Sequence, residues 1–154
     1  MKIGIISDTH DNLPLIKKAV DFFNEYKVDF VVHGGDFVAP FSLNPFLDSL
    51  LCEWRGVLGN NDGEKVGLIE KSQERITPPP LFLTFNSKRL ALTHIYQELE
   101  ADIVIYGHTH EPKIYKEDSG KLIINPGEAC GWLTGKATLA ILDLDNFSAE
   151  IFNI

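Results

Sequence analysis

The stretch Lys2-Ile3-Gly4-Ile5-Ile6-Ser7-Asp8-Thr9-His10 decides how the chain is interpreted. Its apolar first half is short and rich in isoleucine, which predicts a strand buried on both faces. Asp8 and His10 follow at the carboxyl end of this strand, the edge where open α/β sheets bind ligands. Residues two apart on an extended chain point the same way, so an acid and an imidazole can converge there. The pair suggests a metal site, but a helix cap followed by a surface histidine would produce the same pattern.

Length and composition indicate an ordinary globular domain. The chain has 154 residues, of which 44% are hydrophobic and 23% charged, so we expect a single domain over residues 1–154. No uncharged apolar run approaches the roughly 18 residues that a membrane span requires, and the start lacks the layout of a signal peptide. We therefore expect a cytoplasmic protein without membrane association. Cys52 and Cys130 lack CxxC spacing and are expected to be reduced thiols.

The formal net charge of −8 argues against a protein that coats a polyanion with Lys and Arg. Nucleic acid is therefore not an expected partner. An anionic substrate would need a local source of positive charge, which bound divalent cations can supply.

The first half of the chain predicts repeated βαβ units. Asp11 and Asn12 are candidate caps of a helix to about residue 26, and residues 30–34 form the next strand, which ends at Gly34-Gly35-Asp36. A strand, helix and strand of these lengths make the strands parallel, so Asp36 should emerge at the same sheet edge as Asp8. The unit repeats with Asn44 capping a helix from Pro45 to about residue 51, a strand over 53–58 and the exit loop Gly59-Asn60-Asn61-Asp62-Gly63.

The second half predicts a short helix over 67–75, a change of direction at Pro78-Pro79-Pro80, and short strands joined by tight turns. We expect the first part of the chain to form a parallel half and the second part an antiparallel half. The two sheets should pack face to face with helices outside. The predicted strands are 81–85, 89–93, 103–106, 113–116, 122–124, 137–142 and 149–152.

Metal-ligating side chains recur where the predicted strands end, often after glycine. Each alone has an ordinary explanation, such as a turn residue or a surface histidine, but hydrophobic periodicity does not explain their joint occurrence. Carboxylate oxygen, imidazole nitrogen and amide oxygen are suitable ligands for Mn, Fe, Co, Ni or Zn. The residues concerned are Asp8, His10, Asp36, Asn60, His94, His108 and His110.

This series of motifs resembles the calcineurin-like metallophosphoesterases. It is most similar to their small single-domain branch of archaeal and bacterial phosphodiesterases, to which the small retromer subunit is related. The resemblance runs from Lys2 through about Leu142 and includes Asn125-Pro126-Gly127. It implies an α/β fold, a four-layer α-β-β-α sandwich.

The resemblance implies a metal-dependent phosphodiesterase that hydrolyses a small phosphodiester by a bridging hydroxide at a dinuclear centre. Manganese is the first expectation for the two metals, with nickel, cobalt, iron and zinc as alternatives. By similarity, Asp36, Asn60 and Asn61 act in catalysis. One metal would be held by Asp8, His10 and His110, the other by Asn60, His94 and His108, with Asp36 bridging both.

The sequence departs from the family pattern at two places. Many members have a histidine where this chain has Asn61, and an amide cannot donate a proton as a general acid does. The family commonly reads Thr-His-Gly-His before a helix, whereas here Ile95 follows His94 and only residues 95–102 precede the next strand. We therefore expect slow turnover, a preference for good leaving groups, and a site that is more open beside His94.

Several alternatives remain open. A protein-interaction scaffold with a vestigial metal site is one, because the retromer relative uses the fold mainly as an interaction surface. A phosphomonoesterase is another, since the fold does not choose the substrate. A nuclease is disfavoured by the negative charge, and association into a homo-oligomer is left open. Among the other polar residues, we expect His33 to be packed in the interior, Asn12 to act as a helix cap, and Asp62 to orient a ligand.

Overall fold

The computed structural model describes residues 1–154 and contains two mixed sheets. The first has the strand order β11-β10-β1-β2-β3-β4. Within it β1, β2, β3 and β4 run parallel to one another, β10 is antiparallel to β1, and β11 is antiparallel to β10. The strands are β1 (Lys2–Ile6), β2 (Phe30–His33), β3 (Glu53–Val57), β4 (Ile76–Thr77), β10 (Thr138–Asp143) and β11 (Ser148–Asn153).

The second sheet has the order β5-β6-β7-β9-β8, in which β6, β7 and β9 are parallel and the two outer strands are antiparallel to their neighbours. The expected division into a parallel first half and an antiparallel second half is therefore wrong. The last two strands of the chain return to the first sheet, and the second sheet has a parallel centre. Its strands are β5 (Leu81–Phe85), β6 (Lys88–Leu92), β7 (Ile103–Ile105), β8 (Lys113–Lys116) and β9 (Leu122–Asn125).

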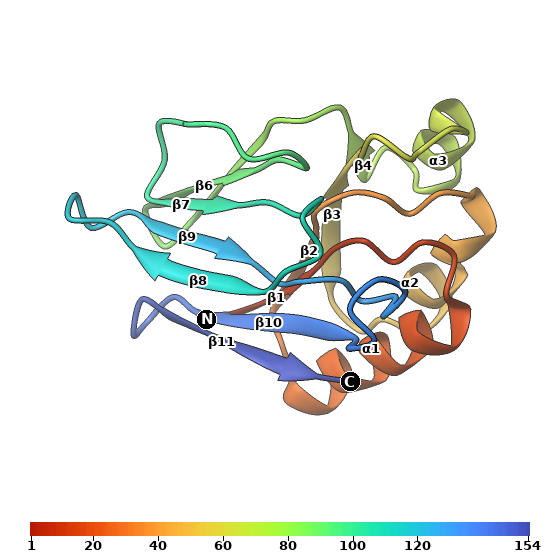
Figure 1. Ribbon diagram of the computed structural model, residues 1–154, viewed down its shortest axis with the longest axis horizontal. Coiled ribbons are helices and arrows are strands. Elements are labelled where there is room, and N and C mark those ends of the chain that lie inside the picture. Colours follow the sequence, from red (N-terminus) through yellow and green to blue (C-terminus); the bar gives the residue numbers. More distant parts are fainter.

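The helices gather on one side of the molecule, away from β6 to β9 (Figure 1). The expected first helix agrees closely with α1. The second is shorter than the predicted 45–51 and follows a 3-10 turn, and the third begins and ends earlier than the predicted 67–75. None of the helices is long and apolar enough to cross a membrane. They are α1 (Leu13–Tyr26), η1 (Pro40–Leu43), α2 (Asn44–Asp48) and α3 (Lys65–Lys71).

The predicted side-chain caps are not formed. Asn12 occupies the N-cap position of α1, but its side chain makes no capping hydrogen bond and its Nδ2 donates instead to the carbonyl of Cys130 at 2.9 Å. Asp11 Oδ1 accepts from the backbone N–H of Ala39. Asn44 is already helical rather than the cap of α2. The side chains of Asp11 and Asn12 therefore bind neighbouring loops instead of capping a helix.

Two large hydrophobic clusters hold the layers together. One lies between the helices and the first sheet and includes Phe23 and Phe46; the other lies between the sheets and includes Ile5 and Ile105. The predicted α/β class is confirmed: two mixed sheets pack face to face, and the helices cover the first sheet. On the outer face of the second sheet the covering layer is the loop 95–102, because this crossover is too short for a helix.

The carboxyl ends of the parallel strands in the two sheets meet. The Nδ1–H of His94, after β6, donates to the carbonyl of Gly34, after β2, at 2.8 Å. The backbone N–H of Ala129, beyond β9, donates to the carbonyl of Ser7, after β1, at 3.0 Å. Loops from both sheets therefore enclose one region of the molecule.

Candidate functional site

Asp8 and His10 lie at the end of β1, as predicted. Asp8 is fully buried, and its carboxylate accepts the backbone N–H of His108 at 3.1 Å. His10 Nε2 is buried without a hydrogen-bond partner, 3.5 Å from Asp36 Oδ2 and 3.8 Å from Asp8 Oδ1. The neighbouring carboxylate of Asp8 raises the pKa of His10 despite burial. An imidazole nitrogen that faces two carboxylates suits either a proton or a cation between them.

Asp36 is at the centre of the cluster. Its Oδ2 lies 3.4 Å from His94 Nε2 and 2.8 Å from Asn61 Nδ2, which donates to it, and its Oδ1 accepts the backbone N–H of Asn61. Burial alone would raise the pKa of Asp36, but the hydrogen bonds from His94 and Asn61 lower it well below its usual range. The carboxylate is thus held in its charged form, facing histidines of both sheets.

Asn60 contacts His94 and one further histidine, His108. Its Oδ1 lies 2.8 Å from His94 Nε2 and 2.8 Å from His108 Nδ1. The Nδ1–H of His94 is occupied by the carbonyl of Gly34, so its Nε2 faces Asn60 and Asp36. The replacement of the family's glycine by Ile95 therefore has not turned His94 away from the cluster.

His110 is the last of the predicted site residues. Its partner, Glu128, was not predicted from the sequence. Its Nε2 lies 3.4 Å from Asp8 Oδ1, and its Nδ1 lies 2.7 Å from Glu128 Oε2. Glu128 is fully buried and also accepts the backbone N–H groups of Leu133 and Thr134. Burial would raise the pKa of Glu128, but these hydrogen bonds lower it to about 2.

A strained backbone accompanies the site residues. Non-glycine residues with positive φ include Asp8 (53°), Asp36 (61°), His108 (66°) and His110 (62°). Each left-handed residue costs on the order of 1–3 kcal/mol, so the surrounding structure must enforce it. Gly107 permits the close approach of the two sheets, because a Cβ there would come within 2.5 Å of Asp8 Oδ2. A glycine at position 107 is therefore required for Asp8 and His108 to lie as close together as they do.

The donor set fits divalent metal ions. The candidate ligand atoms form two groups, and within each group the atoms lie within 4.8 Å of one another. One group comes from Asp8, Asp36 and His94, and the other from His10, His110 and Cys130. Imidazole, carboxylate and amide donors suit first-row transition metals. The unpartnered Nε2 of His10 is the observation that favours a cation over a self-contained hydrogen-bond network.

Comparison with known proteins agrees with this geometry. Residues 1–147 match the calcineurin-like phosphoesterase superfamily domain. The chain belongs to this superfamily. Among members of the superfamily, phosphodiesterase MJ0936 of Methanocaldococcus jannaschii is 42% identical over 94% of this chain and 94% of the relative. The structure of an archaeal phosphodiesterase superposes with a TM-score of 0.92 at 38% identity and covers 100% of both chains.

The superfamily fold also occurs in Vps29 of Chaetomium thermophilum, which superposes with a TM-score of 0.70 at 18% identity over 100% of this chain and 94% of the other. At that level of identity the likeness concerns the fold alone. The structure brings together every residue that the superfamily motifs had singled out, including Asn61.

Two other polar residues behave as expected. His33 is fully buried, stacks on Phe37 with ring centroids 3.6 Å apart, and has a pKa well below its usual value because of burial. Asp62 accepts the backbone N–H groups of Asp36, Val38 and Gly59. It thus holds the loop after β2, which carries Asp36, against the loop after β3.

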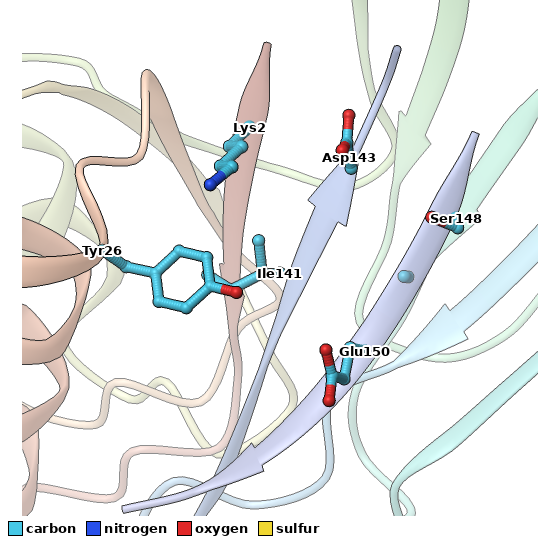
Figure 2. A pocket seen from close by; sticks show the side chains of 7 residues that line it. Lys2, Tyr26, Ile141, Asp143, Ser148 and Glu150 are labelled. Carbon is cyan, nitrogen blue, oxygen red and sulfur yellow. The ribbon is translucent and has the colours of Figure 1, made fainter. Parts of the chain in front are cut away.

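A separate hollow of about 420 Å³ lies at the amino end of β1, opposite the end that carries Asp8. Figure 2 shows Lys2, Tyr26 and Glu150 around it. It contains none of the predicted site residues.

Proposed function

We propose that this protein is a metal-dependent phosphodiesterase that hydrolyses a small phosphodiester at a dinuclear metal centre. The observation that carries the proposal is the convergence of buried carboxylates and imidazoles at the joined sheet edges, with His10 Nε2 unpartnered. The 42% identity to phosphodiesterase MJ0936 supports the same activity. In this proposal the acids and histidines serve as metal ligands, and they are not a polar network that only stabilises the fold.

In this proposal Asp8, His10 and His110 hold one metal, Asn60, His94 and His108 hold the other, and Asp36 contributes to both. Support comes from the position of Asp36 Oδ2, 3.5 Å from His10 Nε2 and 3.4 Å from His94 Nε2. When bound, two divalent cations activate a water molecule and stabilise the negative charge that develops on the phosphorus oxygens. Manganese is our first expectation, followed by nickel, cobalt, iron and zinc.

The chain's own residues have defined tasks in this reaction. Hydrogen bonds to Gly34 and Glu128 orient His94 and His110, so that the Nε2 atoms face the carboxylates. Asn61 holds Asp36 through its side chain and can donate to a phosphoryl oxygen, but it has no proton to give to a leaving alkoxide. Turnover should therefore depend strongly on leaving-group acidity.

Charge makes the metals necessary for substrate binding. The chain has a net charge of −8, and Asp8, Asp36 and Glu128 are buried at the site. A phosphodiester anion would be repelled by this surface in the absence of cations. Metal loading should consequently affect substrate binding as well as the chemical step.

The test is an assay of the protein reconstituted with manganese, nickel or cobalt, using bis(p-nitrophenyl) phosphate, p-nitrophenyl phosphate and a cyclic nucleotide. We expect hydrolysis of the diester, loss of activity with a chelator and recovery on adding metal. Faster hydrolysis of the monoester would identify a phosphomonoesterase. An absence of hydrolysis with every metal, for protein shown by elemental analysis to be loaded, would overturn the proposal and favour a scaffold.

A further inference from the structure

A cleft of about 440 Å³ opens beside the proposed metal ligands Asn60 and His94. It lies where the short loop after β6 leaves the site uncovered, between the start of α3 and the proline segment that joins the sheets. Its volume is in the range of pockets that bind small molecules, about 300–1,000 Å³. The lining residues are Leu58, Gly59, Asn60, Lys65, Pro78, Pro79, Thr93, His94, Ile95 and Gln97.

The walls of the cleft are mainly apolar. Leu58 is buried beneath it, whereas Pro78, Pro79 and Ile95 form exposed parts of its lining. The side chain of Ile95 is 53% exposed although it is large and aliphatic. Such a wall next to polar ligands suits the carbon skeleton of a bound molecule whose charged part lies at Asn60 and His94.

The cleft also contains one cation. Lys65 is the only charged lysine or arginine among the lining residues, and it makes no salt bridge. Gln97 Nε2 is occupied by a hydrogen bond to Thr93 Oγ1 at 3.0 Å, so this part of the polar lining is already satisfied. In a chain with a net charge of −8, an unpaired ammonium next to an anion-binding site favours a second negative group on the ligand.

We propose that this cleft is the subsite for one ester group of the substrate, and that it selects an apolar group that carries an additional anionic substituent. The inference rests on the proposed function, because the phosphorus must sit at the metals for its ester group to reach the cleft. Asn60 and His94 line both regions, so one ligand can occupy the two at once. The subsite gives a diester with such a group an advantage over a methyl ester or a bare phosphate.

Phosphonates test the subsite without leaving-group chemistry, because the P–C bond is not hydrolysed. Calorimetric titration of the manganese-loaded protein would compare methylphosphonate, phenylphosphonate and 3-carboxyphenylphosphonate. Burying several apolar carbons is worth about tenfold or more in affinity. We expect phenylphosphonate to bind at least about tenfold more tightly than methylphosphonate, and the carboxyl group to increase the affinity further.

Matched variants localise the effect. Ile95→Ser should reduce the phenyl-to-methyl affinity ratio to below about threefold, whereas Val66→Ser, at an aliphatic side chain that is 68% exposed outside the cleft, should leave the ratio unchanged. Lys65→Gln should remove the gain from the carboxyl group, whereas Lys71→Gln on the same helix should retain it. Methylphosphonate affinity should stay constant in the two control variants, Val66→Ser and Lys71→Gln, and elemental analysis of all four variants should show the same metal content, which shows that the metal site is intact.

Several results would overturn the inference. Equal binding of phenylphosphonate and methylphosphonate, or an unchanged ratio in Ile95→Ser, would remove the apolar subsite. A carboxyl group without effect, or an effect that survives Lys65→Gln, would remove the anionic preference. If the wild type hydrolyses bis(p-nitrophenyl) phosphate while these comparisons fail, only the subsite is wrong; if it hydrolyses no diester with any metal, the proposed function itself is wrong.

Discussion

The buried carboxylate of Glu128 accepts a hydrogen bond from Nδ1 of His110 at 2.7 Å. This contact leaves Nε2 of the same ring facing Asp8 at 3.4 Å. A carboxylate behind a ligating histidine fixes the tautomer of the ring and its orientation and increases its basicity. Glu128 thus connects the turn after β9 with the proposed metal ligands.

Glu128→Gln should weaken metal binding by about 10- to 100-fold, the usual cost of removing an outer partner of a ligating histidine. Calorimetric titration with manganese measures this directly. Glu150→Gln, at an exposed position of β11, is the matched control and should bind normally. An unchanged affinity in Glu128→Gln would mean that the carboxylate serves only the loop around Thr134.

Asp36→Asn should abolish diester hydrolysis and lower the number of bound metals. The reason is that Asp36 faces histidines of both proposed metal positions, so its loss should exceed the ~10- to 100-fold effect of an outer residue. Elemental analysis of the dialysed protein and a diester assay provide the two measurements. Near-normal turnover would rule out the bridging assignment.

Asn61→His should accelerate hydrolysis of esters with poor leaving groups. A positioned acid commonly contributes about 10²- to 10⁴-fold, and the asparagine cannot supply a proton. We expect a steep fall in wild-type rate as leaving-group pKa increases and a shallower slope in the variant. Asn61→Ala should retain the steep slope at a lower rate. A flat wild-type dependence would show that another residue donates the proton.

Gly107→Ala should destabilise the fold and disturb the site. An added Cβ would collide with Ser7 Oγ and lie 2.5 Å from Asp8 Oδ2, and overpacking of this kind costs about 1–3 kcal/mol. Urea unfolding of the metal-free protein measures the loss. Gly63→Ala, where an added Cβ meets nothing within 4 Å, should change stability by less than about 0.5 kcal/mol. Equal stability of the two variants would contradict the close approach of β1 and the Gly107 loop.

Both cysteines should react slowly with thiol reagents in the native protein. They are free thiols, as predicted, and burial raises the pKa of Cys52 to about 11 and that of Cys130 to about 12. The thiolate is the reactive form, so little of it is present near pH 8. Ellman's reagent should titrate both groups quickly only after unfolding in urea. Rapid labelling of either cysteine in the native state would contradict these environments.

The sequence predicts the meeting of Asp8, Asp36 and Asn60 because each follows a strand of a parallel unit, and such strands end at one edge. It did not predict the partner of Asn12, since the Cys130 carbonyl lies 118 residues away and no local pattern reports it. Glu128 was missed although a signal exists: it directly follows the Asn125-Pro126-Gly127 turn at the end of β9.

Long-range pairing explains the remaining differences. β10 and β11 form a hairpin, and nothing in their sequence tells whether this hairpin joins the first sheet or the second. β4 has only two residues and therefore carries no periodicity. The loop 95–102 could be predicted to be short, but the cleft beside it depends on Pro78 and Lys65, which are distant in sequence.

The position of β1 inside the first sheet has a consequence for biosynthesis. Ile3 pairs with Phe30 on one side and with Leu142 on the other. During translation β2 becomes available early, but one edge of β1 stays unpaired until β10 has left the ribosome. A chain arrested before that point would expose one edge of an apolar strand to other nascent chains. The region around Asp8 therefore forms late in folding. Shortening β10 and β11 should produce aggregates rather than a partly active enzyme.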